Sequence, residues 1–287
     1  MLRLALTVSA LLLAAGCNPL PPAADGLPGG AAVLRVATWN VHDLFDSEDR
    51  RDPPGELDTV LAPDAVEAKL AAVAAVLARL DADVVVLQEV ETLALAEALA
   101  ARAGYAEARL VDGRDPRGID VAALSRLPVA AYVSHAADLA PDGLPLWPRD
   151  CVELHVRAGG RRVAVVASHL SSALSDDGTR RALQAARMRE IANGIAADDP
   201  GALVLVAGDL NDGPDAPALA PLLADGAYVD PLPSGAWTWA TAGRRARLDY
   251  LLVPRAALPA LLGAQVDLGT DAAGASDHRS VVADLLL

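Results

Sequence analysis

The sequence predicts an α/β fold in which mixed β-sheets are covered by helices on their outer faces. Short apolar runs, such as residues 83–87 and 203–207, indicate strands that are buried on both sides. Longer segments between them place apolar residues three and four positions apart, which is the spacing of one helix face. Helices alternate with strands early in the chain and strands follow one another later, so we expect mixed sheets rather than purely parallel ones.

The first half of the chain contains three predicted strands and two predicted helices. The strands cover residues 34–39, 83–87 and 121–124. Asp64 is predicted to cap the first helix, with Glu67 as its capping-box partner three residues later. The apolar face of this helix is formed by Val66, Leu70, Val73, Leu77 and Leu80. The second helix is predicted over residues 92–102.

The second half begins with a predicted hairpin, formed by residues 151–157 and 162–167 around Gly159 and Gly160. A helix over residues 179–195 follows, then a buried strand that runs into Gly208 and Asp209. A short helix near residues 216–223 and strands at 248–253 and 280–286 complete the prediction.

The amino terminus has the features of an export signal. Arg3 precedes the apolar run 4–16, which is too short for a comfortable membrane span. The run ends in LAAGC, which resembles the lipobox of bacterial lipoproteins and implies cleavage before Cys17 and lipidation of its thiol. An ordinary signal peptide with a coincidental cysteine is the alternative. Residues 18–33 are rich in Pro, Gly and Ala and indicate a flexible tether, which leaves residues 34–287 as one catalytic domain.

These features predict an exported protein that is anchored to a bacterial membrane by its lipid. Asn18 follows Cys17 where an aspartate would favour retention in the inner membrane, so the outer membrane is slightly preferred. Nothing in the sequence indicates a protein partner, and we expect a monomer. Cys151 lies in an alternating segment and is expected to be a small buried side chain.

The charge of the chain limits its function classes. The 24 Lys and Arg residues against 38 Asp and Glu residues give a net charge of −14. A surface that binds nucleic acid by charge alone is therefore disfavoured. An enzyme that acts on phosphate esters with bound cations remains compatible, because the cations supply positive charge locally.

Polar side chains recur where the predicted strands end. These residues are of the types that bind metals or move protons, and ligands of open α/β sheets bind outside the strand ends. They are Asn40, Glu89, His169, Asp209, Asn211, Asp249, Asp277 and His278.

The segments that carry these residues resemble the endonuclease/exonuclease/phosphatase superfamily. In chain order they are ATWNVHDLFD, VVVLQEVE, RGIDVAALSR, VVASHLSS, LVAGDLND, RLDYLLV and ASDHRSVVADL. The resemblance spans residues 34–287 and implies a four-layer sandwich of two mixed sheets with helices outside. It also implies divalent-metal-dependent hydrolysis of a phosphoester by in-line attack of water.

The resemblance implies a role for each matching residue. Asn40, Glu89 and Asp277 correspond to the metal site, which suits Mg²⁺ or Mn²⁺. His278 corresponds to the histidine beside the scissile phosphate, and Asp249 to the carboxylate that orients it. The remaining matches are Asp209 and Asn211, which position the water and the phosphate, and His169, which donates to a phosphoryl oxygen.

Several assignments stay open at this stage. Either His278 or Asp209 can take the proton of the water. Arg117, in the RGID segment, is a candidate substrate-binding residue. We expect His42, His135 and His155 to lie outside the site, and Trp237 and Trp239 to pack in the core.

The substrate is the least readable property. A nucleic acid phosphodiester is the first expectation, a phospholipid or sphingomyelin diester the second, and a phosphomonoester the third. A lipoprotein receptor that keeps the fold without catalysis is the alternative of another class. The choice depends on the predicted loops 46–62, 107–118, 136–150 and 234–247.

Overall fold

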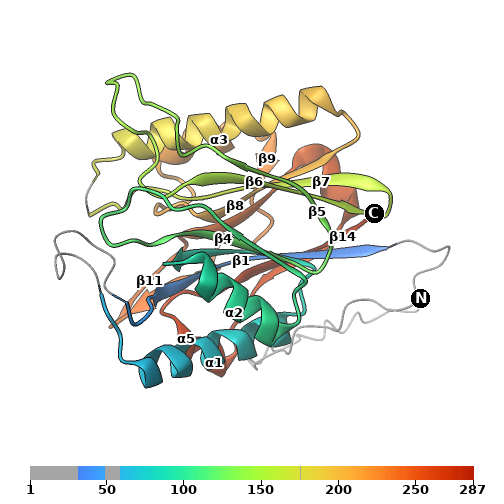
Figure 1. Cartoon of the computed structure of the whole chain (residues 1–287). Coiled ribbons are helices and arrows are strands. Elements are labelled where there is room, and N and C mark those ends of the chain that lie inside the picture. Colours follow the sequence, from blue (N-terminus) through green and yellow to red (C-terminus); the bar gives the residue numbers. More distant parts are fainter. Residues whose placement is uncertain (1–31, 49–58, 175) are drawn as a thin grey trace, which may run out of the picture.

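Two six-stranded mixed β-sheets pack face to face in the computed structural model of the chain (Figure 1). The structure describes residues 32–48, 59–174 and 176–287. Cys17 and most of the tether predicted at 18–33 therefore lie outside the described residues. None of the helices in the described ranges is both long and apolar enough to cross a membrane.

The first sheet has the strand order β13-β14-β1-β2-β4-β3. β1 and β2 are parallel, and the other neighbours pair in the antiparallel direction. The bounds are β1 Val33–Leu44, β2 Val84–Val90, β3 Glu107–Leu110, β4 Asp120–Ser125, β13 Leu261–Val266 and β14 Val281–Leu286.

The second sheet has the order β5-β6-β7-β8-β12-β9. Here β7 and β8 are the parallel pair. The bounds are β5 Val129–Ser134, β6 Cys151–Ala158, β7 Arg161–His169, β8 Leu203–Asp209, β9 Tyr228–Val229 and β12 Asp249–Pro254. The small hairpin of β10 (Trp239–Thr241) and β11 (Arg244–Ala246) stands apart from both sheets.

Helices cover the outer face of each sheet, so the predicted four-layer sandwich is confirmed. In Figure 1, α3 lies above the second sheet, and α1 and α2 lie below the first. The bounds are α1 Pro63–Leu80, α2 Leu93–Ala103, α3 Thr179–Asp198, α4 Ala220–Leu223 and α5 Thr270–Ala275, with 3₁₀ turns at η1 Pro217–Leu219 and η2 Arg255–Ala260.

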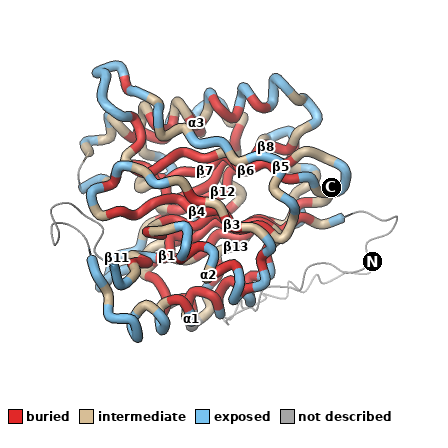
Figure 2. Tube along the Cα trace, in the orientation of Figure 1, coloured by how far each residue is buried: buried red, intermediate tan, exposed pale blue. Residues whose placement is uncertain are grey.

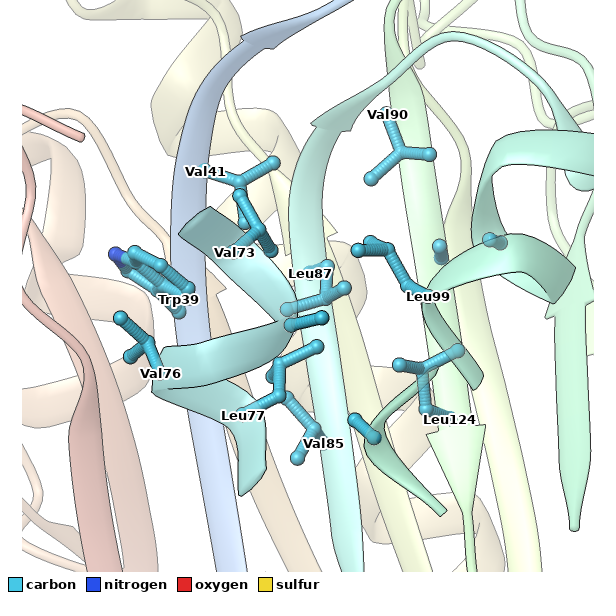
Figure 3. Close-up of a cluster of buried hydrophobic side chains, with 14 of the residues drawn as sticks. Trp39, Val41, Val73, Val76, Leu77, Val85, Leu87, Val90, Leu99 and Leu124 are labelled. Atoms are coloured by element: carbon cyan, nitrogen blue, oxygen red, sulfur yellow. The ribbon is translucent and has the colours of Figure 1, made fainter. Parts of the chain in front are cut away.

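Burial on both faces explains why the central strands are apolar throughout. Successive side chains of a strand point to opposite faces. In β2, Val84 and Val86 lie in the cluster between the sheets, whereas Val85 and Leu87 pack toward α1 and α2 with Trp39 (Figure 3). Figure 2 shows the same arrangement as a buried centre with exposure at the helix surfaces and loops.

Gly208 allows β7 and β8 to approach each other closely just before Asp209. Its φ is 131°, and a Cβ atom at this position would lie 1.9 Å from the carbonyl oxygen of Ser168. Both facts require glycine. The residue thereby fixes the ends of two strands that carry site residues.

The start of the first helix differs from the prediction. The N-cap is Ala62, which makes no side-chain cap, and Asp64 lies within the first turn. Pro63 occupies the first helical turn, where its missing N–H has no intrahelical partner to lose and its fixed φ suits the helix. The predicted Asp64–Glu67 capping box is therefore wrong.

The sequence also did not predict several short strands. β3 lies within the predicted loop 107–118, and β10 and β11 lie within the predicted loop 234–247. β5 has no fully buried residue, so its sequence carries no clear alternation. Short and partly exposed strands leave little periodic signal, and their positions depend on the neighbours with which they pair.

Candidate active site

The site lies where strand ends from both sheets meet. In the second sheet, His169 of β7 is in register with Asp209 of β8, and Asp209 is in register with Asp249 of β12. Residues in register on adjacent strands project from the same face of a sheet. The sheet therefore brings together three residues that are 80 positions apart in the chain at their extremes (169 to 249).

Asn40 connects the two sheets. Its side chain is fully buried, and its Nδ2 donates to Glu89 Oε1 (3.1 Å) and to Asp209 Oδ2 (3.0 Å). Its Oδ1 accepts from the backbone amide of His42 at 2.9 Å. One amide thus joins the carboxylates that the sequence assigned to the metal and to the attacking water.

Glu89 lies within β2 where the strand register shifts between Gln88 and Val90, in a left-handed conformation with a φ of 65°. Its Oε2 accepts from the backbone amide of Asp43 at 2.8 Å. Burial works to raise the pKa of Glu89, but the hydrogen bonds from Asn40 and Asp43 outweigh it and hold the pKa below its usual value. The carboxylate of Glu89 is therefore ionised and can serve as an oxygen ligand.

Asp277 is half-buried and has two partners that the sequence did not predict. Its Oδ1 lies 2.5 Å from His42 Nδ1, and its Oδ2 accepts from Trp239 Nε1 at 2.8 Å. Burial opposes ionisation, yet the contact with His42 and the charge of His278 lower the pKa of Asp277 to about 2. This carboxylate is ionised at any physiological pH.

His278 is held by Asp249. Its Nδ1 lies 2.8 Å from Asp249 Oδ2 and 3.9 Å from Asp209 Oδ2. Burial alone would lower the pKa of His278, but the charge of Asp249 and the hydrogen bond to it raise the pKa to about 10. Asp249 therefore orients the ring, and the raised pKa keeps the ring protonated near neutral pH.

Asp209 behaves in the opposite way to Glu89. Burial, and then the neighbouring charge of Asp249, raise the pKa of Asp209 to about 7. Its Oδ1 accepts from the backbone amide of Asn211 at 2.9 Å. Asn211 has a φ of 53°, and its Nδ2 donates to the carbonyl of Leu170. A bend directly after β8 places Asn211 beside Asp209.

His169 has an unpredicted partner in Arg149. Nη2 of Arg149 lies 3.2 Å from Nε2 of His169, and both side chains are buried. Arginine only donates, so Nε2 accepts and the proton of the ring belongs on Nδ1. Burial, and then the charge of Arg149, hold the pKa of His169 well below its usual value. The imidazole is thus neutral.

Arg117 lies at the edge of this group. Its Nη1 is 3.6 Å from Asp43 Oδ1, its Nε is 3.3 Å from Asp115 Oδ1, and its side chain is 42% exposed. The exposed part can reach a ligand without breaking a buried pair.

Two sequence expectations about residues outside the site are wrong. His42 contacts Asp277, although it matched no motif. Trp237 and Trp239 are only partly buried, and Trp239 donates to Asp277. Cys151 is buried as expected. His135 and His155 both pair with Glu153 of β6 and lie outside the site, as expected.

Lys69 of α1 connects two backbone segments of the site. Its Nζ donates to the carbonyl of His42 at 2.6 Å and to the carbonyl of Ala275 at 2.7 Å. These two segments carry Asn40 and Asp277, so one side chain ties them together. The apolar periodicity of α1 gave no sign of this role.

Backbone strain is concentrated in the same place. Among the described residues, five non-glycine residues have a positive φ: His42, Asp43, Asp81, Glu89 and Asn211. Four of them belong to the site, and Asp81 caps a helix. Such conformations cost about 1–3 kcal/mol each and persist where the surroundings enforce them.

Two sets of side chains in the site contain carboxylates that could hold a cation. Asp209, Asp249 and His278 place one ligand atom each within 4.8 Å of one another. In that group, however, the Nδ1 of His278 already bonds to Asp249. The set of Asn40, Glu89 and Asp277 offers two ionised carboxylates and an amide oxygen, which are the hard donors that Mg²⁺ and Mn²⁺ prefer. In this set the amide oxygen of Asn40 already accepts from the backbone amide of His42, so each set has one ligand atom that is engaged within the protein.

Comparisons with known proteins point to one family. A profile described as "Endonuclease/Exonuclease/phosphatase family" matches residues 37–278. No curated protein sequence matches the chain significantly.

Solved structures match the fold over most of the chain. Truncated TDP2 from Caenorhabditis elegans has a TM-score of 0.61 and 19% identity, and the match covers 89% of this chain and 98% of that one. Sphingomyelinase C from Streptomyces griseocarneus has a TM-score of 0.56 and 22% identity, covering 88% and 99%. An endonuclease/exonuclease/phosphatase from Beutenbergia cavernae DSM 12333 has a TM-score of 0.56 and 25% identity, covering 89% and 72%.

Proposed function

The chain belongs to the endonuclease/exonuclease/phosphatase family, and on this premise we propose that it hydrolyses a phosphodiester by in-line attack of water with a divalent metal ion. The observation that carries the proposal is the bridge made by Asn40. Its amide bonds to Glu89 and to Asp209, so a metal-binding carboxylate and a water-positioning carboxylate are held beside one buried group.

Asn40, Glu89 and Asp277 would hold the ion, which we propose to be Mg²⁺ or Mn²⁺. When bound, the ion neutralises charge on the phosphate and stabilises the leaving oxygen. The protein's contribution is to keep both carboxylates ionised. The hydrogen bonds to Glu89 and the contacts of Asp277 with His42 and Trp239 support this part of the proposal.

Residues at the strand ends of the second sheet are proposed to position the attacking water and accept its proton. Asp209 and Asn211 are proposed to position the water, and Asp209, whose pKa of about 7 leaves it partly ionised near neutral pH, is proposed to take its proton. His278 Nδ1 lies 3.9 Å from Asp209 Oδ2, so the charge of the protonated ring favours the ionised form of Asp209. Asp249 keeps the imidazole of His278 oriented through its 2.8 Å contact.

Arg149 and His169 are proposed to face the phosphoryl oxygens. The buried guanidinium of Arg149 provides a fixed positive charge, and its contact with Asp115 at 3.3 Å holds it in place. His169, oriented by Arg149, donates from its protonated nitrogen. Arg117, which is more exposed, is proposed to bind a more distant part of the substrate.

We propose a nucleic acid strand as the first substrate. The hairpin β10–β11 supports this, because it is fastened next to His278 by an isolated bridge between Trp239 and His278. It carries the exposed Arg244 and Arg245, and Arg245 stacks 4.5 Å from the ring of Trp237. Cationic and aromatic groups beside a cleavage site suit a polyanionic chain.

A sphingomyelin or phospholipid diester is the second candidate, and a phosphomonoester is the third. The similarity to sphingomyelinase C and the anchor proposed at Cys17 favour the hypothesis of a lipid substrate. A tether of this kind would place the site near lipid headgroups.

The substrate test uses the full chain in detergent with Mg²⁺ or Mn²⁺. Supercoiled plasmid and vesicles that contain sphingomyelin are assayed in parallel, with His278→Ala as the control. Nicking that requires metal and is lost in His278→Ala supports the nuclease proposal. Cleavage of the vesicle lipid alone supports the second candidate. Retention of either activity in His278→Ala contradicts the proposed site.

Membrane anchoring is a separate proposal. We propose that Cys17 is lipidated and anchors an exported monomer, with the outer membrane preferred. Cys17→Ala should move the protein from the membrane fraction of a bacterial host to the soluble fraction. A variant that stays in the membrane fraction would contradict lipidation at this residue.

A further inference from the structure

Lys69 is the only lysine among the 24 Lys and Arg residues of the chain. It lies half-buried on α1, and its Nζ donates to the carbonyls of His42 at 2.6 Å and of Ala275 at 2.7 Å. A lysine presents three donors on one compact nitrogen, whereas the donors of an arginine spread out in a plane. Two carbonyls that meet at one point therefore suit a lysine, in a chain that otherwise uses arginine.

The first of these carbonyls belongs to a strained turn. His42 and Asp43 have φ angles of 56° and 52°, and such left-handed conformations persist where their surroundings enforce them. The carbonyl of His42 and the amide of Asp43 are the two ends of one planar peptide, and they point in opposite directions. Lys69 holds the carbonyl end, and Glu89 Oε2 accepts from the amide end at 2.8 Å. Lys69 therefore fixes the direction of an amide that holds the Glu89 carboxylate.

The second carbonyl lies two residues before Asp277. Ala275 ends α5, and the hydroxyl of the next residue, Ser276, donates to the carbonyl of Asn40 at 2.8 Å. By holding Ala275 as well as His42, Lys69 fixes the segment of Asp277 relative to the segment of Asn40. All three residues assigned to the metal site thus depend on backbone that Lys69 contacts.

The charge of Lys69, by contrast, opposes a bound cation. Burial lowers the pKa of Lys69, whereas three neighbouring carboxylates work to raise it. They are Asp43, Glu89 and Asp277, and the last two belong to the proposed metal site. An ammonium close enough to be affected by these carboxylates also repels a divalent ion at that site. On charge alone, removal of Lys69 should strengthen metal binding.

We propose that Lys69 is a positioning residue that strengthens metal binding in spite of its charge, because it holds the His42–Asp43 peptide and the end of α5. The inference rests on the proposed metal site of Asn40, Glu89 and Asp277. Without the ammonium, the strained peptide can rotate and take its N–H away from Glu89. The positional and electrostatic contributions of Lys69 have opposite signs, so a binding measurement separates them.

Calorimetry with Mn²⁺ on the full chain, in the absence of substrate, tests this sign. Lys69→Met keeps an aliphatic side chain and removes the donors with the charge. It should bind Mn²⁺ about tenfold more weakly than wild type, or weaker still. Hydrogen exchange at the amide of Asp43 should also be faster in the metal-free variant. Arg102→Met is the matched control, because it removes an equal charge and a 2.9 Å contact with Glu67 of the same helix, and it should change neither value.

The proposal is overturned if Lys69→Met binds Mn²⁺ as tightly as wild type or more tightly, or if Arg102→Met weakens binding equally. Where Lys69→Met does not fold, Lys69→Arg decides, because it keeps the charge but spreads the donors. It should bind Mn²⁺ about threefold more weakly or worse, and wild-type affinity overturns the proposal.

Failure of this inference is distinguishable from failure of the proposed function. A wild-type chain that binds no Mn²⁺ contradicts both the proposed metal site and the role of Lys69. Wild-type binding together with unchanged binding by Lys69→Met contradicts the role of Lys69 alone.

Discussion

The two halves of the site use the same residue types in opposite electrostatic states. In the half that comes from the first sheet, the pKa of Glu89 is lowered and that of Asp277 falls to about 2. In the half that comes from the second sheet, the pKa of Asp209 rises to about 7. The first half is a set of permanent anions, whereas the second half can exchange a proton near neutral pH.

The backbone explains the difference. Glu89 and the segment of His42 and Asp43 leave the regular strand geometry with positive φ angles, which lets amide and side-chain donors converge on the carboxylates. Asp209 stays in a regular strand, and its register partner is another carboxylate, Asp249. The irregular backbone at His42, Asp43 and Glu89 therefore favours an ionised Glu89, whereas regular strand pairing places the carboxylates of Asp209 and Asp249 side by side.

The largest loss of turnover is expected from Asp209→Asn, in the half of the site that comes from the second sheet. The change keeps the shape but removes the carboxylate that positions the water, so turnover should fall about a thousandfold. The affinity for Mn²⁺, measured by calorimetry, should fall by no more than about tenfold, because Asp209 reaches the proposed metal ligand Glu89 only through their shared partner Asn40. A large loss of Mn²⁺ affinity would show that the two halves do not have separate roles.

The matched change in the first half is Glu89→Gln. The variant should bind Mn²⁺ about a hundredfold more weakly, because a charged ligand is replaced by a neutral amide. Turnover at saturating Mn²⁺ should recover in part, unlike that of Asp209→Asn. Calorimetry and a titration of the rate with metal measure the two quantities. An unchanged affinity would remove Glu89 from the metal site.

Asp249→Asn tests whether the charge of Asp249 raises the pKa of His278. In the metal-free protein, the pKa of His278 is raised to about 10 against the effect of burial, chiefly by the charge of Asp249. Without that charge, the pKa should fall by about one to two units. Titration of the His278 ring by NMR measures the shift. Asp225→Asn, on the exposed surface, serves as the control, and an equal shift in both variants would contradict the assignment.

The smallest effect is expected from substitution of Glu153, which lies outside both halves of the site and affects stability. Burial opposes its ionisation, but the hydrogen bonds from His135 and His155 lower its pKa to about 2 from 4.5. Its contribution to stability is thus present above pH 4.5 and is lost as the pH falls toward 2.

Glu153→Gln should therefore cost about 1 kcal/mol of unfolding free energy at pH 7, and the difference from wild type should shrink below pH 4. Urea unfolding at several pH values checks both statements. A difference that grows on acidification would have the wrong sign.

The sequence predicted the parts of the molecule that depend on local pattern. Apolar runs marked the central strands because both faces are buried, and the motif residues at their ends marked Asn40, Glu89, Asp209 and His278. The structure brings these residues together as expected.

Residues that act through distant partners left no such pattern. His42 and Asp277 are separated by 235 positions, and Trp239 reaches the same carboxylate from a hairpin that has no buried face. Arg149 ends a long loop, and only the fold places it against His169. Periodicity reports which face is buried, but it does not report which partner arrives there.

Glu89 and its neighbours are proposed to support metal-dependent cleavage of a phosphodiester. Release of para-nitrophenol from bis(para-nitrophenyl) phosphate by the full chain measures this cleavage without depending on the natural substrate. We predict release that requires Mg²⁺ or Mn²⁺, stops with EDTA, and falls about a hundredfold in Glu89→Gln at limiting metal. Release that continues in EDTA, or that is equal in wild type and Glu89→Gln, would contradict the account.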